Sequence, residues 1–289
     1  MSMAQGGEVW SGTAPAKVNL YLHVVGKRDD GYHLLDSLVV FADVSDALTL
    51  ARADAPSLAV SGPFAGAVPA GDDNLVLRAV RRLAAATGHP DGIAITLDKR
   101  LPVAAGIGGG SADAAAVLRG LARIWDLAAD DPRLREVAAG LGADVPVCLD
   151  GRTAWLGGVG ERLDPGPDLA GIPILLVNPG VPLSTPAVFK ARQGGFSPEA
   201  RFAEARPGLD RLCRLLADRG NDLAEPAGRL VPAVTEVLAA LAAQPGCRLS
   251  RMSGSGATCF GLFDSPAAAR AAASVLAGHG WWAAAGALL

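Results

Sequence analysis

The sequence predicts a chain of mixed strands and helices in two domains. Residues 16–25 alternate apolar and polar side chains, which is the period of a half-buried strand. Residues 72–88 space their apolar side chains at helical intervals and end at a glycine. Proline and glycine cluster at 164–171, which predicts a linker. We therefore expect one domain at 1–165 and a second at 171–289.

The remaining elements follow from the same two periods and from turn residues. Strands are predicted at 34–44, 47–53, 57–62, 92–100 and 172–180, with strand–turn–strand segments at 143–163 and 247–263. Helices are predicted from about residue 111 to 125, at 132–142, near 185–192, 208–220 and 232–243, and at 265–278.

Composition and charge exclude several classes of protein. Half of the residues are hydrophobic and 19% are charged, which is typical of a globular chain. The net charge of −3 argues against a general nucleic-acid binder, although a local cluster of donors could still bind an anionic small molecule. Four cysteines without metal-ligand spacing favour reduced thiols, and neither a signal peptide nor a membrane span is recognised. We therefore expect a cytoplasmic protein.

The most informative short segment places four glycines in positions 106–110, between the predicted strand 92–100 and the helix that follows. The free N–H groups and the positive dipole end of a helix's first turn bind anions. Glycines let the backbone approach phosphate oxygens, and they permit positive φ angles. Ser111 can cap the helix or offer a hydroxyl to phosphate. We predict a phosphate cradle here. The alternative is a closely packed strand–helix junction, for which one or two glycines suffice.

Two common phosphate-binding motifs do not fit this segment. A Walker loop requires a lysine before the serine, and none stands between the glycines and Ser111. The dinucleotide fingerprint requires a final glycine on the first strand–helix turn, whereas "GIGGGS" ends in serine and lies far from the first strand. The alternative that the protein is a nicotinamide-dependent oxidoreductase thus rests only on an imperfect match to the dinucleotide fingerprint.

Residues 102–115, "PVAAGIGGGSADAA", resemble the second motif of the GHMP kinases, a family of small-molecule kinases. Residues 15–33, "PAKVNLYLHVVGKRDDGYH", resemble the opening of the branch whose acceptor alcohol carries a cytidyl group, in the non-mevalonate route to isoprenoid precursors. Segments 142–149, 178–189 and 250–263 resemble later motifs of that branch. The resemblance implies an α+β fold of two domains, with the active site in the cleft between them. It also implies ATP-dependent phosphorylation of the acceptor's 2-hydroxyl.

The glycine motif departs mildly from the family pattern. Members often carry glycine where Ala104 or Ala105 stands, and a second serine where Ala112 stands. These changes concern the conformation of the loop and the role of that second hydroxyl.

The resemblance assigns the chemistry to Asp144 and Lys17. An aspartate in a turn commonly caps local N–H groups, and a lysine on a strand is commonly solvated. In the family pattern Asp144 is the general base, and Lys17 keeps it ionised and polarises the acceptor hydroxyl. An adjacent cation lowers the pKa of a carboxyl, so we expect a weakly basic aspartate that acts mainly through positioning.

The resemblance also assigns the binding residues. On the acceptor side, His33 reads the cytosine, Tyr32 and Phe189 stack on it, and Asn19 and Thr185 bind hydroxyl or phosphate groups. On the nucleotide side, the implied contacts are Asn74, Leu75, Lys99, Pro102, Val103, Ala104, Ala105, Gly106, Ile107, Gly108, Gly109, Gly110, Ser111 and Ala112. The turn 253–256 is expected to support the cradle.

The expected ligands are ATP as co-substrate, Mg²⁺ held mainly by nucleotide phosphates and water, and a cytidyl small molecule. We expect no nucleic-acid or membrane partner, and a monomer or weak homodimer. One alternative is another GHMP kinase, acting on homoserine or a mevalonate-type acceptor, against which "DGYH" at 30–33 argues. A second is a non-catalytic nucleotide-binding protein, against which the retention of Lys17 and Asp144 argues.

Overall fold

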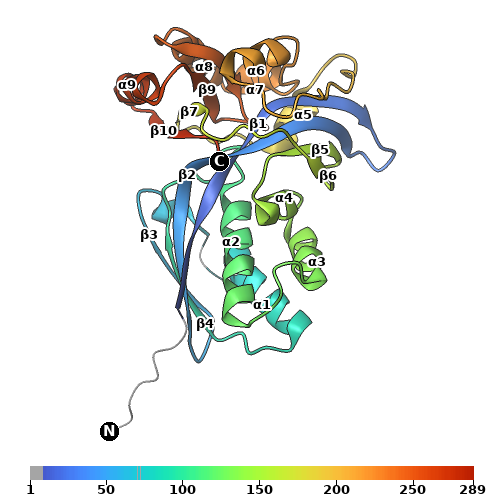
Figure 1. The fold of residues 1–289 in the computed structure, drawn as a ribbon, viewed down its shortest axis with the longest axis vertical. Helices are drawn as coiled ribbons and strands as arrows, with labels where there is room; N and C mark the ends of the chain where they lie inside the picture. Colours follow the sequence, from blue (N-terminus) through green and yellow to red (C-terminus); the bar gives the residue numbers. More distant parts are fainter. Residues whose placement is uncertain (1–8, 70, 72) are drawn as a thin grey trace. The chain divides into compact units, whose positions relative to one another are not determined.

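The computed structural model describes residues 9–69, 71 and 73–289. The chain divides into two compact units whose segments alternate along the sequence. Within the described residues, the first unit comprises 9–14, 45–103 and 109–150, and the second comprises 15–44, 104–108 and 151–289. Strands β1 (Val9–Lys27) and β2 (His33–Arg52) contribute residues to both units, and they are the long blue strands of Figure 1. The predicted boundary at 164–171 divides the sequence into an N-terminal and a C-terminal part, and it stays a prediction.

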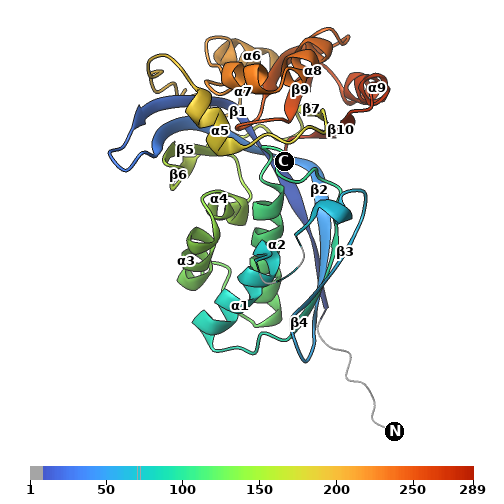
Figure 2. The same ribbon diagram turned by 180° about the vertical axis from the view of Figure 1, so that it is seen from behind.

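In the first unit, helices cover a small sheet. Residues Ala47–Arg52 of β2 pair antiparallel with β4 (Ile93–Asp98), and β4 pairs parallel with β3 (Ser57–Ser61). A short 3₁₀ turn occupies Ala65–Ala67. The helices are α1 (Leu75–Thr87), α2 (Gly109–Ile124), α3 (Pro132–Leu141) and α4 (Val145–Asp150). They gather on one side of these strands, as Figures 1 and 2 show from opposite directions.

The second unit contains two sets of paired strands. Residues 35–39 of β2 pair with β5 (Ala154–Gly158), which pairs with β6 (Arg162–Pro165). A separate antiparallel sheet has the order β10-β7-β9-β8. Its strands are β7 (Pro173–Asn178), β8 (Cys247–Met252), β9 (Cys259–Phe263) and β10 (Trp282–Ala287).

Helices complete the second unit. They are α5 (Thr185–Ala191), α6 (Leu209–Leu216), α7 (Ala224–Leu230), α8 (Ala233–Ala242) and α9 (Pro266–Ala277). Helices α8 and α9 pack on the four-stranded sheet. The apolar core between them also includes Leu22 and Val24 of β1. The N-terminal strand is therefore part of a core that the C-terminal third of the sequence builds.

Strand β1 differs from its predicted character. The alternation at 16–25 predicts one solvated face, but every residue from Ala16 to Val24 is buried. Its polar side chains are covered because other parts of the same unit pack over them. Lys17, Asn19, Tyr21 and His23 thus form a buried polar row, which is expensive unless each group has a partner or a function.

Several element boundaries also differ from prediction. Residues 145–150 form helix α4 where a strand was predicted, because a short apolar run fits either structure and Pro146 suits a helix's first turn. Segments 34–44 and 47–53 form the single strand β2. Helix α7 and strand β10 were not predicted. The alanine-rich β10 is strand because it pairs with β7 along its whole length.

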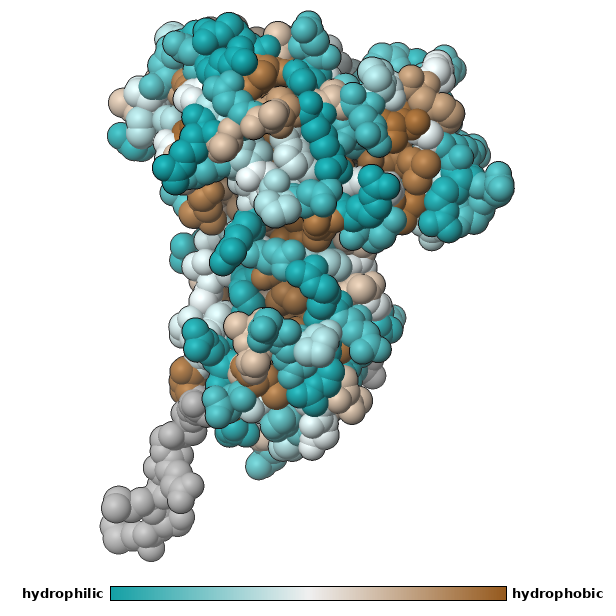
Figure 3. All heavy atoms as spheres, turned by 45° about the vertical axis from the view of Figure 1, so that its right-hand side comes forward, coloured by the Kyte–Doolittle hydropathy of each residue, from teal (hydrophilic) through white to brown (hydrophobic). Residues whose placement is uncertain are grey.

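Hydrophilic residues predominate on the face that Figure 3 displays, and apolar residues form separate small areas there. Over the described residues, no helix is long and apolar enough to cross a membrane. Cys148, Cys213, Cys247 and Cys259 are all free thiols.

Candidate functional site

Three residues of the loop 104–108, where a phosphate cradle is predicted, have left-handed backbone angles. Gly106 and Gly108 have positive φ angles of 76° and 63°, which glycine adopts without steric cost. Ala104 also has a positive φ, of 53°, at one of the two positions where the family pattern has glycine. A β-carbon on Gly106 would lie 2.5 Å from the Gly256 carbonyl oxygen. Gly106 is therefore required by both conformation and space.

Three successive carbonyl groups tie this loop to the rest of the second unit. The Ala105 oxygen accepts from Thr258 N–H (3.1 Å), and the Ile107 oxygen accepts from Lys17 N–H (3.0 Å). Between them, the Gly106 oxygen accepts from the Ser253 hydroxyl (3.1 Å), which itself accepts from Asn19 N–H. The predicted support from the turn 253–256 thus has a concrete form, since Ser253 joins β1 to the loop.

The amide groups of the same loop remain available. No described group accepts a hydrogen bond from the N–H of Gly106, Ile107 or Gly108. Helix α2 of the first unit begins at Gly109, two residues earlier than predicted, and the N–H groups of its first turn have no partner within the helix. With the carbonyls turned toward protein partners and the amides unpaired, this backbone suits an anion.

Lys17 and Asn19 adjoin the loop on the polar row of β1. The Lys17 side chain passes beside Gly108, where an added β-carbon would lie 3.3 Å from Lys17 Cβ and 3.5 Å from its Cε. Asn19 donates to the Ser37 hydroxyl (2.8 Å), but its buried Oδ1 has no partner within the described structure. A buried acceptor without a partner is uncommon in folded proteins, and a donor from a ligand or a water would complete its hydrogen bonding.

The acceptor-side residues are brought together only in part. The rings of His33 and Phe189 stack with centroids 4.9 Å apart and an interplanar angle of 25°. Burial, followed by the positive charges of Lys27 and Arg192, lowers the pKa of His33, so its imidazole is neutral near pH 7. A neutral imidazole offers one donor and one acceptor, which suits the edge of a base. Tyr32, in the adjoining turn, is 67% exposed.

Thr185 lies at the start of α5 in the second unit. Its hydroxyl hydrogen-bonds to that of Ser255 (2.7 Å), within the turn that supports the loop. Asn178, at the end of β7, donates to Thr258 (2.9 Å), which lies between that turn and β9. The turn therefore connects the loop to the residues around α5.

Asp144 belongs to the first unit and immediately precedes α4. Its backbone carbonyl accepts from Cys148 N–H (3.2 Å), so the residue marks the start of that helix. Its side chain is half-buried. Its assignment as general base, like the other assigned roles, stays a prediction.

Asn74 has local partners. Its side chain accepts from Val76 N–H (2.8 Å) and donates to the Pro69 carbonyl (2.9 Å), which makes it the N-cap of α1. Leu75 is the first residue of that helix and is half-buried. The contact with adenine that the resemblance implies for these two residues stays a prediction.

Lys99 lies deep in the first unit, with a side chain 2% exposed. Its ammonium is 2.5 Å from Asp46 Oδ2 and 2.5 Å from Asp113 Oδ2, and both carboxylates are buried. Asp46 Oδ1 also accepts from the N–H groups of Arg100 (2.6 Å) and Leu101 (2.8 Å). Burial raises the pKa of Asp113 to about 7; the Lys99 charge opposes this effect and the Asp46 charge adds to it. We call these three residues the Lys99 cluster.

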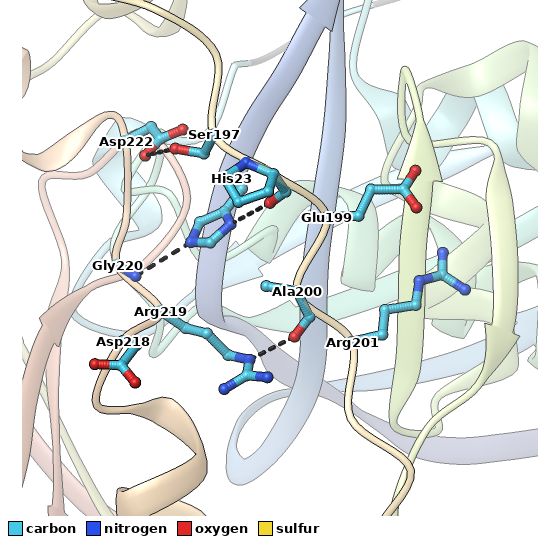
Figure 4. Close-up of a pocket in the computed structure, with 10 residues that line it drawn as sticks. His23, Ser197, Glu199, Ala200, Arg201, Asp218, Arg219, Gly220 and Asp222 are labelled. Carbon is cyan, nitrogen blue, oxygen red and sulfur yellow. Dashed lines mark hydrogen bonds between the residues drawn. The ribbon is translucent and has the colours of Figure 1, made fainter.

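A separate pocket of about 560 Å³ lies along the second unit, farther along β1. Figure 4 shows His23 between two backbone partners, with Nδ1 2.9 Å from the Pro198 carbonyl and Nε2 3.3 Å from Gly220 N–H. Because Nε2 accepts from Gly220 N–H, Nδ1 is the ring nitrogen that donates to the Pro198 carbonyl. Arg219 donates to the Ala200 carbonyl in the same view. None of the predicted site residues lines this pocket.

The sequence did not reveal two groups of residues near the predicted site. Ser253 could be expected only as part of a supporting turn, and its bridge to Gly106 depends on tertiary contact. Nothing in the sequence indicates that Asp46 and Asp113 lie together, because 67 residues separate them and each resembles an ordinary surface aspartate.

Two family models match the chain. The model described as GHMP kinases N terminal domain matches residues 74–152, and that described as GHMP kinases C terminal matches residues 201–280. A protein of Paramagnetospirillum magneticum, named 4-diphosphocytidyl-2-C-methyl-D-erythritol kinase, is 58% identical over 96% of this chain and 97% of its own length. A protein of the same name from Rhodospirillum rubrum is 54% identical over 96% and 91%.

Solved structures show the same likeness. A crystal structure of 4-(cytidine 5'-diphospho)-2C-methyl-D-erythritol kinase has a TM-score of 0.79 and 39% identity, covering 96% of this chain and 99% of its own. A homoserine kinase from Cytophaga hutchinsonii has a TM-score of 0.69 but only 17% identity, covering 100% and 97%. The second likeness concerns the fold alone.

Proposed function

The chain belongs to the GHMP kinase family, and on that premise we propose that it phosphorylates the 2-hydroxyl of 4-diphosphocytidyl-2-C-methyl-D-erythritol with ATP. The products are the 2-phosphate and ADP, and the reaction is a step of the non-mevalonate route to isoprenoid precursors. Relatives named for this kinase are 54–58% identical over nearly their whole length, whereas the neighbour named homoserine kinase shares 17%. The cytidyl acceptor is therefore preferred over homoserine or mevalonate.

The backbone of residues 105–108 carries this proposal. Its carbonyls are held by Lys17, Ser253 and Thr258, and its amides donate to no described group. Such a backbone binds the phosphate chain of ATP without needing to rearrange. Fixed donors aimed at the transferring group stabilise the charge that develops during phosphoryl transfer.

The proton transfer is assigned to Asp144 and Lys17. The acceptor oxygen bonds to the γ-phosphorus while the bond from that phosphorus to the ADP oxygen breaks. The hydroxyl proton passes to the Asp144 carboxylate, and the Lys17 ammonium stabilises the negative charge on the acceptor oxygen. The position of Lys17 beside Gly108 supports its part in this step.

Recognition of the acceptor's cytosine is assigned to His33 and Phe189. Their stacked rings provide an aromatic surface, and the neutral His33 ring can exchange hydrogen bonds with the cytosine edge. The unpaired Oδ1 of Asn19 can accept from a substrate hydroxyl, and Thr185 offers a further hydroxyl. Tyr32, exposed beside His33, is assigned to stack on the cytosine, and Phe189 is the second stacking residue.

Mg²⁺ is proposed to arrive with ATP. Among the described residues, no group of three or more His, Cys, Asp or Glu side chains could hold a metal ion. Phosphate oxygens and water therefore supply most of its ligands, as is common for this ion, and it neutralises phosphate charge when bound. We place the reaction in the cytoplasm, because all four cysteines are free thiols, and we keep a monomer or weak homodimer as the proposed state.

Phosphate transfer from radiolabelled ATP tests the proposal directly. The purified protein is incubated with the cytidyl substrate, homoserine or mevalonate, and the labelled products are separated. We expect labelled 2-phosphate from the cytidyl substrate alone. Labelled phosphohomoserine, without labelled product from the cytidyl substrate, would replace the proposed acceptor.

Substitution of Asp144 tests the assigned base. We expect Asp144→Ala to lower kcat by roughly 10²-fold or more, because it removes the group that receives the proton. Binding of an ATP analogue, measured by calorimetry, should stay within about twofold of the wild-type value, since the cradle is untouched. Asp150→Ala is the matched control, because Asp150 is the last residue of α4, the helix that Asp144 immediately precedes. Normal turnover by Asp144→Ala would refute the assignment.

A further inference from the structure

The Lys99 cluster lies against the first turn of α2, the helix that begins at Gly109. A β-carbon on Gly109, the first residue of α2, would lie 3.2 Å from Lys99 Nζ. The ammonium is thus packed directly against that turn. It is buried, so it cannot serve as an ordinary solvated surface charge.

The contacts of Lys99 connect three parts of the first unit. Its backbone N–H donates to the Ser61 carbonyl (2.8 Å), and its carbonyl accepts from Phe64 N–H (3.1 Å). Its ammonium reaches Asp46 on β2 and Asp113 in the early part of α2. Because Asp46 also holds the amides of Arg100 and Leu101, the segment entering the loop is fixed at several points.

The charges and hydrogen bonds of the Lys99 cluster are not fully matched, as they would be in an ion pair that only stabilises the fold. Two carboxylates face one ammonium, and Asp113 Oδ1 is buried without a partner among the described residues. Buried charges stabilise a protein only when geometry and hydrogen bonding compensate their desolvation, and apolar residues often serve as well. The desolvation of these charges is thus not explained by stability alone. The cluster packs against the first turn of α2, and holding that turn in place would explain it.

We infer that Lys99 is a positioning residue for ATP: by tying Asp113 of α2 to Asp46 of β2, its ammonium sets the direction of the amides at 109–111. This inference rests on the proposed function. In this inference Lys99 acts on ATP indirectly, through the first turn of α2, whereas the family resemblance suggests direct contact with the nucleotide. Misplacement of binding groups by about 1 Å can cost up to 10²-fold in an enzyme, so loosening this connection should weaken ATP binding selectively.

Kinetics of matched variants test the inference. Lys99→Met keeps an unbranched side chain that is one heavy atom shorter and removes its charge, and we expect it to raise KM for ATP by roughly 10–10²-fold. KM for the cytidyl substrate should stay within about twofold, since the acceptor groups are untouched. Arg100→Met is the control, because Arg100 is the adjacent cation and its guanidinium is exposed and paired with Asp98. A folded Lys99→Met with unchanged KM for ATP, or with both KM values raised equally, would overturn the inference.

A second pair of variants covers the case in which Lys99→Met does not fold. Asp113→Ala cuts the connection to α2 while leaving Lys99 paired with Asp46, and Asp113→Asn keeps an acceptor for the ammonium. We expect Asp113→Ala to weaken ATP-analogue binding, measured by calorimetry, and Asp113→Asn to preserve it. Equal binding by the two variants would overturn the inference. A wild-type protein that binds the analogue but phosphorylates no cytidyl substrate would refute the proposed function, and these binding constants would then still decide the role of Lys99.

Discussion

Gly106 shows how one residue determines the shape of the loop 104–108. Its φ of 76° and the 2.5 Å approach of the Gly256 oxygen leave no room for a side chain. Gly110, four residues later, has nothing within 4 Å of its hypothetical β-carbon. The four glycines of 106–110 therefore serve different purposes, although the sequence does not distinguish them.

Alanine substitutions at these two positions should have opposite effects. We expect Gly106→Ala to lower the free energy of unfolding by about 2–4 kcal/mol, from left-handed backbone cost and overpacking. Gly110→Ala should raise it by about 0.5–1 kcal/mol, because alanine favours the helix. Urea unfolding of both variants measures the difference, and equal effects would contradict the assignment of Gly106.

Asp113 should make stability depend on pH. Its pKa is raised from 3.8 to about 7, so the native state binds more protons than the unfolded state between these values. The resulting stabilisation is complete below about pH 4 and is lost as the pH rises through 7. We expect Asp113→Asn to remove about 2–3 kcal/mol of the decline in unfolding free energy between pH 5 and 8. Urea unfolding at both pH values tests this, and parallel pH dependence of the two proteins would refute it.

At the scale of elements, the sequence predicted what local physics decides. Helix α1 ends at Thr87 with Gly88 as its C-cap, and α9 begins at Pro266 directly after its N-cap Ser265; both boundaries depend on capping chemistry within one turn. Helix α4 and strand β10 were not predicted correctly because their type depends on partners elsewhere. β10 is strand because β7 offers an edge, despite its alanine content.

The cap of α1 separates a structural role from a nucleotide-binding role. We expect Asn74→Ala to lower the free energy of unfolding by about 1 kcal/mol, because the cap to Val76 N–H is lost. Asn74→Ser should keep stability within about 0.5 kcal/mol, since serine also caps helices. If Asn74 contacts adenine as well, KM for ATP rises in both variants, because both lack the amide. Urea unfolding and ATP kinetics together decide the matter, and a stable Asn74→Ala would contradict the capping role.

The same distinction applies to the candidate site. The glycine loop and the helix after it could be predicted because they are adjacent in sequence, while the binding of phosphate by this loop stays a prediction. The Ser253 bridge and the Lys99 cluster could not, because they join residues 147 and 53 positions apart. The orphaned Oδ1 of Asn19 is likewise visible only once its neighbours are placed.

For the whole molecule, the decisive feature is that β1 completes a core built by the end of the chain. Leu22 exchanges backbone hydrogen bonds with Gly220 (3.0 Å) and Asp222 (2.9 Å), and its side chain joins the core of that unit. Val24 N–H donates to the Asp222 carboxylate (2.7 Å). A cut in the predicted linker would therefore separate this core from two of its apolar side chains.

Fragments cut at the linker test this dependence. We expect residues 166–289 alone to unfold without a cooperative transition, because the surface that Leu22 and Val24 cover is exposed. Co-expression with residues 1–165 should restore a cooperative transition in calorimetry. A cooperative transition of 166–289 alone would show that β1 is dispensable for that unit.

The distance along the chain between β1 and its partners also affects how the protein is made. Val24 and Asp222 are 198 positions apart. At translation rates of roughly 5–20 residues per second, the opening strand waits about 10–40 s on the ribosome before its partners emerge. A segment of alternating apolar residues is thus exposed during synthesis, when chaperones and aggregation compete for it.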